Sequence, residues 1–78
     1  MSERTEHAAG EAIELVVNGK GRTAPAGVTV RKYLESLDLR PELVVVERNR
    51  EILSRDHYDD VRLQEGDRLE LVHFVGGG

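Results

Sequence analysis

The chain has 78 residues, of which 38% are apolar and 33% charged, and this length allows one domain with one hydrophobic core. Acidic side chains outnumber basic ones by 15 to 11; the net charge of −4 disfavours a nucleic-acid binder, because such proteins carry a basic face. The absence of cysteine excludes disulfides, thiolate metal ligands and a cysteine nucleophile. No apolar run approaches the roughly 20 residues of a membrane helix and no secretory signal is present, so we expect a cytoplasmic protein without a membrane partner.

The N-terminal third predicts a tail followed by a β-hairpin. Residues 1–12 are polar, charged or small, and we expect them to form a disordered tail. The fold should begin at Ile13, because residues 13–17 are rich in branched side chains, which favour a strand. The dipeptide Asn18-Gly19 then predicts a tight turn, with residues 20–24 as the returning strand that ends before Pro25.

A helix is expected next. Thr29 is a suitable N-cap, and the helix should end near Asp38, before Arg40-Pro41, because the residue before a proline is disfavoured in helical conformation. Apolar residues recur at i, i+3, i+4 and i+7 and therefore share one helix face: Val30, Tyr33, Leu34 and Leu37.

The remainder predicts strands and turns. Residues 43–46 form a compact apolar run typical of a buried strand, and residues 52–53 a short one. Tyr58 should anchor the polar turn between residues 54 and 60, and residues 68–75 form the last strand. Hairpin, helix and three further strands indicate an α+β domain over residues 13–75, a mixed sheet with one helix packed across one face.

Two motifs suggest chemistry but have simpler explanations. Residues 19–24 match the pattern G-x-G-x-x-A, yet Pro25 and Gly27 interrupt the helix that a dinucleotide site requires. The acidic stretch 56–60 contains one histidine, His57, and is typical of a solvated turn rather than a metal site. With no serine–histidine–acid arrangement, we predict no catalytic residue and no bound metal.

The end of the chain is the strongest functional candidate. Alternation places Val72 and Phe74 on the strand face that an ordinary half-exposed strand would keep polar. That face is either covered or reserved for a partner. Residues 76–78 are glycines, which should form a flexible arm whose tip carries the α-carboxylate of Gly78. A frayed end or a linker remnant is the simpler alternative.

These residues resemble the ThiS family of sulfur carriers of thiamin biosynthesis, which has a ubiquitin-like β-grasp fold. The resemblance extends from about Ile13 to Gly78. The matching segments are Val17-Asn18-Gly19, Thr29-Val30 with Leu34 and Leu37, residues 44–49, 51–53 and 66–72, and the ending Phe74-Val75-Gly76-Gly77-Gly78.

The resemblance implies a carrier rather than an enzyme. Gly78 would be adenylated with ATP by the E1-like adenylyltransferase ThiF and converted to a thiocarboxylate with sulfur from a cysteine desulfurase. The thiazole synthase ThiG would receive that sulfur, and the chain itself would bind no cofactor. Gly76 and Gly77 would form the arm, while Val72 and Phe74 are partner-binding candidates mainly because of their strand face.

Two departures from the family pattern leave partner choice open. Ser54 stands where proline is frequent, and Arg48 stands at a strand position that is commonly apolar. A related carrier for molybdopterin synthesis or for tRNA thiolation therefore stays an alternative. So does a ubiquitin-like modifier, which would form an isopeptide through the same carboxylate, and a module that only binds.

Overall fold

The computed structural model describes residues 11–74. Within them the chain forms five strands, one α-helix and two short 3₁₀ turns. In chain order these are β1 (Ala12–Val17), β2 (Lys20–Pro25), α2 (Val30–Ser36), η1 (Pro41–Leu43), β3 (Val44–Arg48), β4 (Glu51–Leu53), η2 (Arg55–His57) and β5 (Arg68–His73). In this part of the chain no helix is long and apolar enough to span a membrane.

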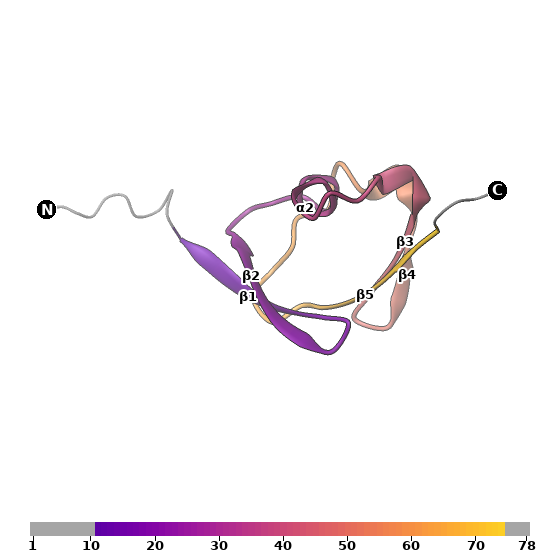
Figure 1. Ribbon diagram of the computed structural model, residues 1–78. Coiled ribbons are helices and arrows are strands. Elements are labelled where there is room, and N and C mark those ends of the chain that lie inside the picture. Colours follow the sequence, from indigo (N-terminus) through magenta and orange to yellow (C-terminus); the bar gives the residue numbers. More distant parts are fainter. Residues whose placement is uncertain (1–10, 75–78) are drawn as a thin grey trace, which may run out of the picture.

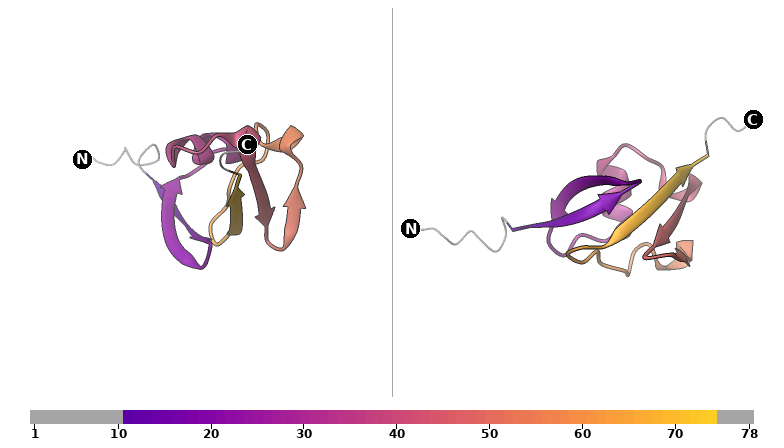
Figure 2. Two further views of the ribbon diagram at one scale, coloured as in Figure 1. Left: turned by 45° about the vertical axis from the view of Figure 1, so that its right-hand side comes forward. Right: turned by 90° about the horizontal axis from the view of Figure 1, so that it is seen from below.

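The strands form one mixed sheet in the order β2-β1-β5-β3-β4. The β1–β5 pair is parallel, and the other three pairs are antiparallel. Figures 1 and 2 show α2 lying across one face of this sheet, with β5 in the middle of the strands. The predicted α+β architecture is therefore confirmed.

The core lies between α2 and the sheet. The helix face predicted from its spacing is confirmed, since Val30, Tyr33 and Leu34 are buried and Leu37 packs against them. The buried strand residues facing the helix include Leu15, Val17, Ala24, Val44, Val46 and Leu69. Tyr58 is also buried, and its hydroxyl donates to the Val44 carbonyl at 2.7 Å, which confirms its predicted role as an anchor.

Several predicted boundaries move by one or two residues. Thr29 caps α2 as predicted, because its side chain accepts from the Lys32 amide at 3.2 Å. The helix ends at Ser36 rather than near Asp38, which takes the positive φ of 62° typical of a helix end. Strand β2 includes Pro25. Proline is tolerated there because β2 is an edge strand, and no further strand lies on its outer side to require the missing N–H.

The boundaries of the strands β1, β3 and β5 also differ slightly from the predicted ones. β1 begins at Ala12, one residue before the predicted start of the fold, and Leu43 belongs to η1 instead of β3. β5 ends at His73 rather than Val75. The rest of the predicted tail, Val75 and the glycine arm 76–78 lie outside the described residues.

Candidate functional site: the end of the last strand

Strand β5 leads directly to the C-terminal candidate. It pairs with β3 along residues 69–73 and with β1 at its first two residues, Arg68 and Leu69. Gly76, Gly77 and Gly78 follow it and lie outside the described residues. What the structure describes is the strand that precedes those residues in the chain.

Val72 and Phe74 lie on the sheet face away from α2, and each is 54% exposed. Within the described chain this face is therefore open rather than covered. Val45 lies directly opposite Val72 on β3, and Ile52 on β4, 68% exposed, shares the same face by the strand alternation. We call Val45, Ile52, Val72 and Phe74 the open-face patch. Exposed apolar groups of this kind are typical of protein-binding surfaces.

The charged residues beside this patch carry both signs. A shallow hollow on the same side of the sheet is lined by Glu47, Arg50, Arg68 and Glu70. Glu47 and Glu70 lie opposite one another on β3 and β5. An apolar centre with a charged margin is the usual composition of a protein interface.

A buried carboxylate fixes the start of β5. Asp67 accepts from the Gln64 amide at 2.8 Å, from Asn49 Nδ2 at 3.0 Å and from Arg48 Nε at 2.9 Å. Burial would raise the pKa of the Asp67 carboxyl, but these three donors outweigh it and lower the pKa. Arg48, which departs from the family pattern, is thus the ion-pair partner of a buried acid.

Asn49 extends the same network to the backbone. Its Oδ1 accepts from the Arg68 amide at 2.9 Å, and its own amide donates to the Arg68 carbonyl at 2.8 Å. Asn49 has a φ of 52°, in the left-handed region that asparagine tolerates better than most residues. The turn between β3 and β4 is therefore tied to the first residue of β5.

A second asparagine holds the middle of β5. The predicted hairpin turn is confirmed, with φ of 50° at Asn18 and 82° at Gly19. The Asn18 side chain also accepts from the Leu71 amide at 2.8 Å and donates to the Leu71 carbonyl at 3.3 Å. It therefore continues the β1–β5 ladder beyond the last backbone pair. The Asn18-Gly19 pattern predicted the turn, but the contact with Leu71 could not be predicted without the topology.

The two weaker motifs do not assemble into sites. Residues 19–24 lie in the hairpin turn and β2, without the helix that a phosphate would require. In the acidic stretch, His57 Nδ1 lies 3.9 Å from Asp60 at the surface, and Asp59 pairs with Arg31. Across residues 11–74 no three potential ligand side chains gather as a metal site would need.

A mixed five-stranded sheet with a parallel central pair, crossed by one helix and continued by a glycine ending, defines a ubiquitin-like β-grasp domain. The sequence profile of the ThiS family matches residues 9–78, which is most of the chain. The chain belongs to the ThiS family, as its residues indicated, and hence to a family of sulfur carriers in thiamine biosynthesis.

Three relatives illustrate the match. The sulfur carrier protein ThiS of Bacillus subtilis is 46% identical over 50 residues, 64% of this chain and 76% of its own. A crystal structure of the thiamine biosynthesis protein ThiS from Geobacter metallireducens has a TM-score of 0.72 at 36% identity and covers 85% of this chain and 100% of its own. A protein of Magnetococcus marinus named thiazole synthase is 46% identical over 66 residues, 85% of this chain; this chain spans only 20% of that relative's length.

Proposed function

We propose that the chain carries sulfur as a thiocarboxylate on Gly78 and donates it for synthesis of the thiazole of thiamin. Membership of the ThiS family is the observation that carries this proposal. The ending Gly76-Gly77-Gly78 supports it, because a glycine arm without side chains can enter a narrow active site. Such a chain is a substrate of enzymes and not itself an enzyme.

The chemistry requires activation, because a carboxylate is a poor electrophile. An oxygen of the Gly78 carboxylate attacks the α-phosphorus of ATP, pyrophosphate leaves, and a mixed anhydride with AMP forms. The outer sulfur of a persulfide supplied by a cysteine desulfurase then attacks the acyl carbon, and AMP leaves. A thiol reductant cleaves the S–S bond of the resulting acyl disulfide, which releases the thiocarboxylate. The E1-like adenylyltransferase ThiF would catalyse the first step. ATP belongs to that enzyme, so the carrier needs no cofactor of its own.

Thiazole synthase is the acceptor that we favour. The Magnetococcus marinus relative that bears this name contains a segment similar to 85% of this chain. A shared polypeptide supports a working partnership between the two kinds of domain. The open-face patch is the surface through which we expect the partners to dock, with Val72 and Phe74 nearest to the arm.

Adding one alanine after Gly78 tests the proposal. The extension leaves residues 11–74 unchanged but replaces the reactive glycine carboxylate with that of another residue. We expect thiazole formation, reconstituted with the adenylyltransferase, the desulfurase, ATP and thiazole synthase, to fall to background. Thiazole formation at the rate of the unextended protein would contradict the carrier function.

The same reconstitution separates the alternatives by product. Isopeptide conjugates to lysine without thiocarboxylate would indicate a ubiquitin-like modifier. A thiocarboxylate that transfers its sulfur to a molybdopterin precursor or to tRNA, and not to thiazole synthase, would indicate the related carriers. An unmodified chain that still binds through Val72 and Phe74 would indicate a binding module.

A further inference from the structure

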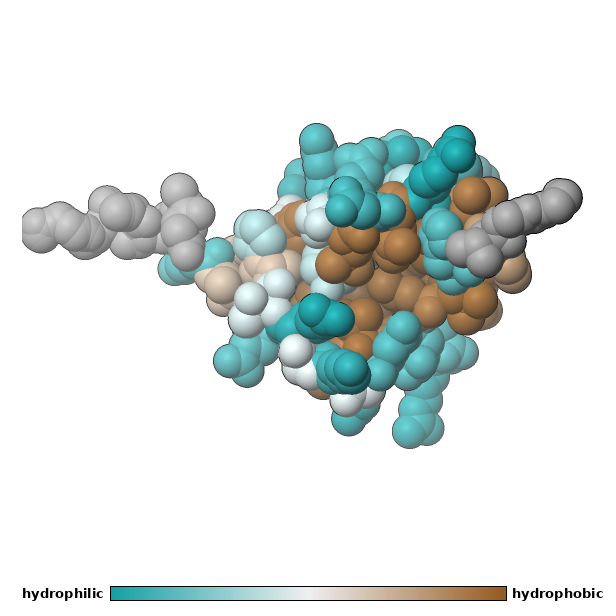
Figure 3. All heavy atoms as spheres, viewed as in Figure 1, coloured by the Kyte–Doolittle hydropathy of each residue, from teal (hydrophilic) through white to brown (hydrophobic). Residues whose placement is uncertain are grey.

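A second surface flanks the end of β5 on the side of the helix. Because α2 is short, it leaves the tip of the β1–β2 hairpin uncovered, and a hollow of about 330 Å³ lies there. We call it the hairpin hollow; its lining residues are Val17, Asn18, Lys20, Arg22, Leu37, Leu39, Leu71 and His73. Figure 3 shows apolar surface between the helix and the hairpin, with hydrophilic side chains along the hairpin.

The charged wall of this hollow is positive. Lys20 and Arg22 alternate on the same face of β2, opposite Val17 and Leu15, and both are exposed. The ion pairs found within residues 11–74 involve neither of them. In a chain with a net charge of −4, two unpaired cations over an apolar floor favour an acidic occupant.

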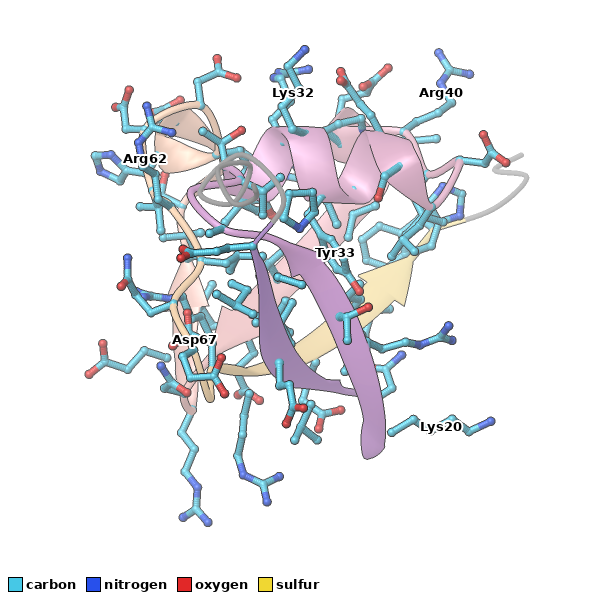
Figure 4. The ribbon with its side chains drawn as sticks, turned by 90° about the vertical axis from the view of Figure 1, so that its left-hand side faces the viewer. Lys20, Lys32, Tyr33, Arg40, Arg62 and Asp67 are labelled. Carbon is cyan, nitrogen blue, oxygen red and sulfur yellow. The ribbon has the colours of Figure 1, made fainter. Side chains whose placement is uncertain are left out.

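Two buried polar atoms have no hydrogen-bond partner in the described chain. They are the Tyr33 hydroxyl and Nε2 of His73, whose side chain lines the hollow. Tyr33 is only 3% exposed, and Figure 4 shows it descending from α2 toward the strands. Burial raises the pKa of Tyr33, and the charge of Arg22 opposes that rise. Of the two, Nε2 of His73 belongs to a residue that lines the hollow, where a polar group entering the hollow can pair with it.

The main chain of β5 is also incompletely paired beside the hollow. The Phe74 amide donates to the Leu43 carbonyl, so the antiparallel alternation turns the N–H and C=O of His73 away from β3. On the side of β1, backbone pairing ends at Val17. The Asn18 side chain already bonds the amide and the carbonyl of Leu71, so the main-chain groups of His73 come next along the strand. A short extended segment can therefore continue the sheet next to His73.

We propose that the hairpin hollow receives an extended, acidic segment of the adenylyltransferase that acts on Gly78. The main chain of the segment pairs with His73, its carboxylates face Lys20 and Arg22, and an apolar side chain rests on Leu37 and Leu39. This is strand addition guided by charge. The inference rests on the proposed function. It gives the carrier two docking surfaces, the open-face patch on one face of the sheet and the hairpin hollow on the opposite face.

Charge reversal on matched positions tests it. One variant carries Lys20→Glu and Arg22→Glu. Its control carries Lys32→Glu and Arg40→Glu, which reverse the same number of charges at exposed positions outside the hollow. Figure 4 shows Lys20 at the hairpin end and both control residues at the helix side of the molecule. In thiocarboxylate formation with the cognate adenylyltransferase, we expect the KM for the hollow variant to rise about tenfold with little change in kcat, and the control to change by less than about threefold. Equal KM values for the two variants would overturn the inference.

Hydrogen exchange of the unmodified chain provides a test that needs no variant. When the adenylyltransferase binds, we expect exchange of the His73 amide to slow at least tenfold, while the Lys32 amide stays unchanged. Unchanged exchange at His73 in the complex would overturn the inference. Failure of the wild-type chain to acquire sulfur in the reconstituted reaction would instead overturn the proposed function, so the two failures are distinguishable.

Discussion

At the scale of single residues, Asn18 has two separable roles. It supplies the positive φ of the hairpin turn, and its side chain bonds both main-chain groups of Leu71. Asn18→Gly keeps the turn and removes only the second role. We therefore expect it to lower the free energy of unfolding by about 1–2 kcal/mol in urea titration.

Asp38→Gly is the matched control for this change. Asp38 has a φ of 62°, and its exposed side chain makes no hydrogen bond within residues 11–74. Glycine there should be neutral or slightly stabilising. Equal free energies of unfolding for the two glycine variants would show that the Leu71 contact contributes nothing.

Asp67 makes the stability of the domain depend on pH. Its pKa lies below the ordinary 3.8 in the folded state, so its contribution is present above that value and is lost as the pH falls through the folded pKa. Asp67→Asn removes the charge that Arg48, Asn49 and the Gln64 amide stabilise. We expect a loss of about 1.5–3 kcal/mol at pH 7.

The difference between wild type and Asp67→Asn in urea unfolding should shrink as the pH is lowered below 3.8. A difference that stays constant from pH 7 to pH 3 would contradict the assigned role of this carboxylate. The interpretation of Arg48 as its partner would then fail as well.

At the scale of elements, β5 combines a supported backbone with an unsupported outer face. Val72 and Phe74 are half exposed, so the double variant Val72→Thr, Phe74→Ser should change the free energy of unfolding by less than about 1 kcal/mol. The same variant should raise the KM for thiocarboxylate formation about tenfold or more, because exposed apolar anchors contribute strongly to binding. Steady-state kinetics with intact-mass detection would measure it.

Ile52→Thr is the control on the same open face. Ile52 is 68% exposed but lies on β4, two strands away from β5. We expect a smaller change in KM than for the β5 variant. A larger effect at Ile52 would move the centre of the docking surface away from the arm.

The elements themselves were predictable where local patterns determine them. The Asn18-Gly19 turn, the Thr29 cap and the apolar face of α2 follow from residue spacing alone. The long-range bonds do not: Asn18 with Leu71 and Arg48 with Asp67 join residues whose proximity depends on strand order. The hairpin hollow escaped prediction for the same reason, since its lining comes from three separate segments.

At the scale of the whole molecule, the chain separates a folded body from the residue proposed to react. Ordering three glycines in an active site costs roughly 3–6 kcal/mol at about 1–2 kcal/mol per residue. Contacts made by the body must offset that cost, and the open-face patch and the hairpin hollow lie on either side of β5 to make them. The carrier therefore contributes binding energy while its enzymes contribute the chemistry.

Fragmentation mass spectrometry of the chain after reaction with the adenylyltransferase, the desulfurase, cysteine, a thiol reductant and ATP tests this account most directly. We expect the intact mass to rise by one sulfur minus one oxygen, with the whole increase on the fragment that ends in Gly78. An unchanged mass, or an increase located within residues 11–74, would contradict the central claim.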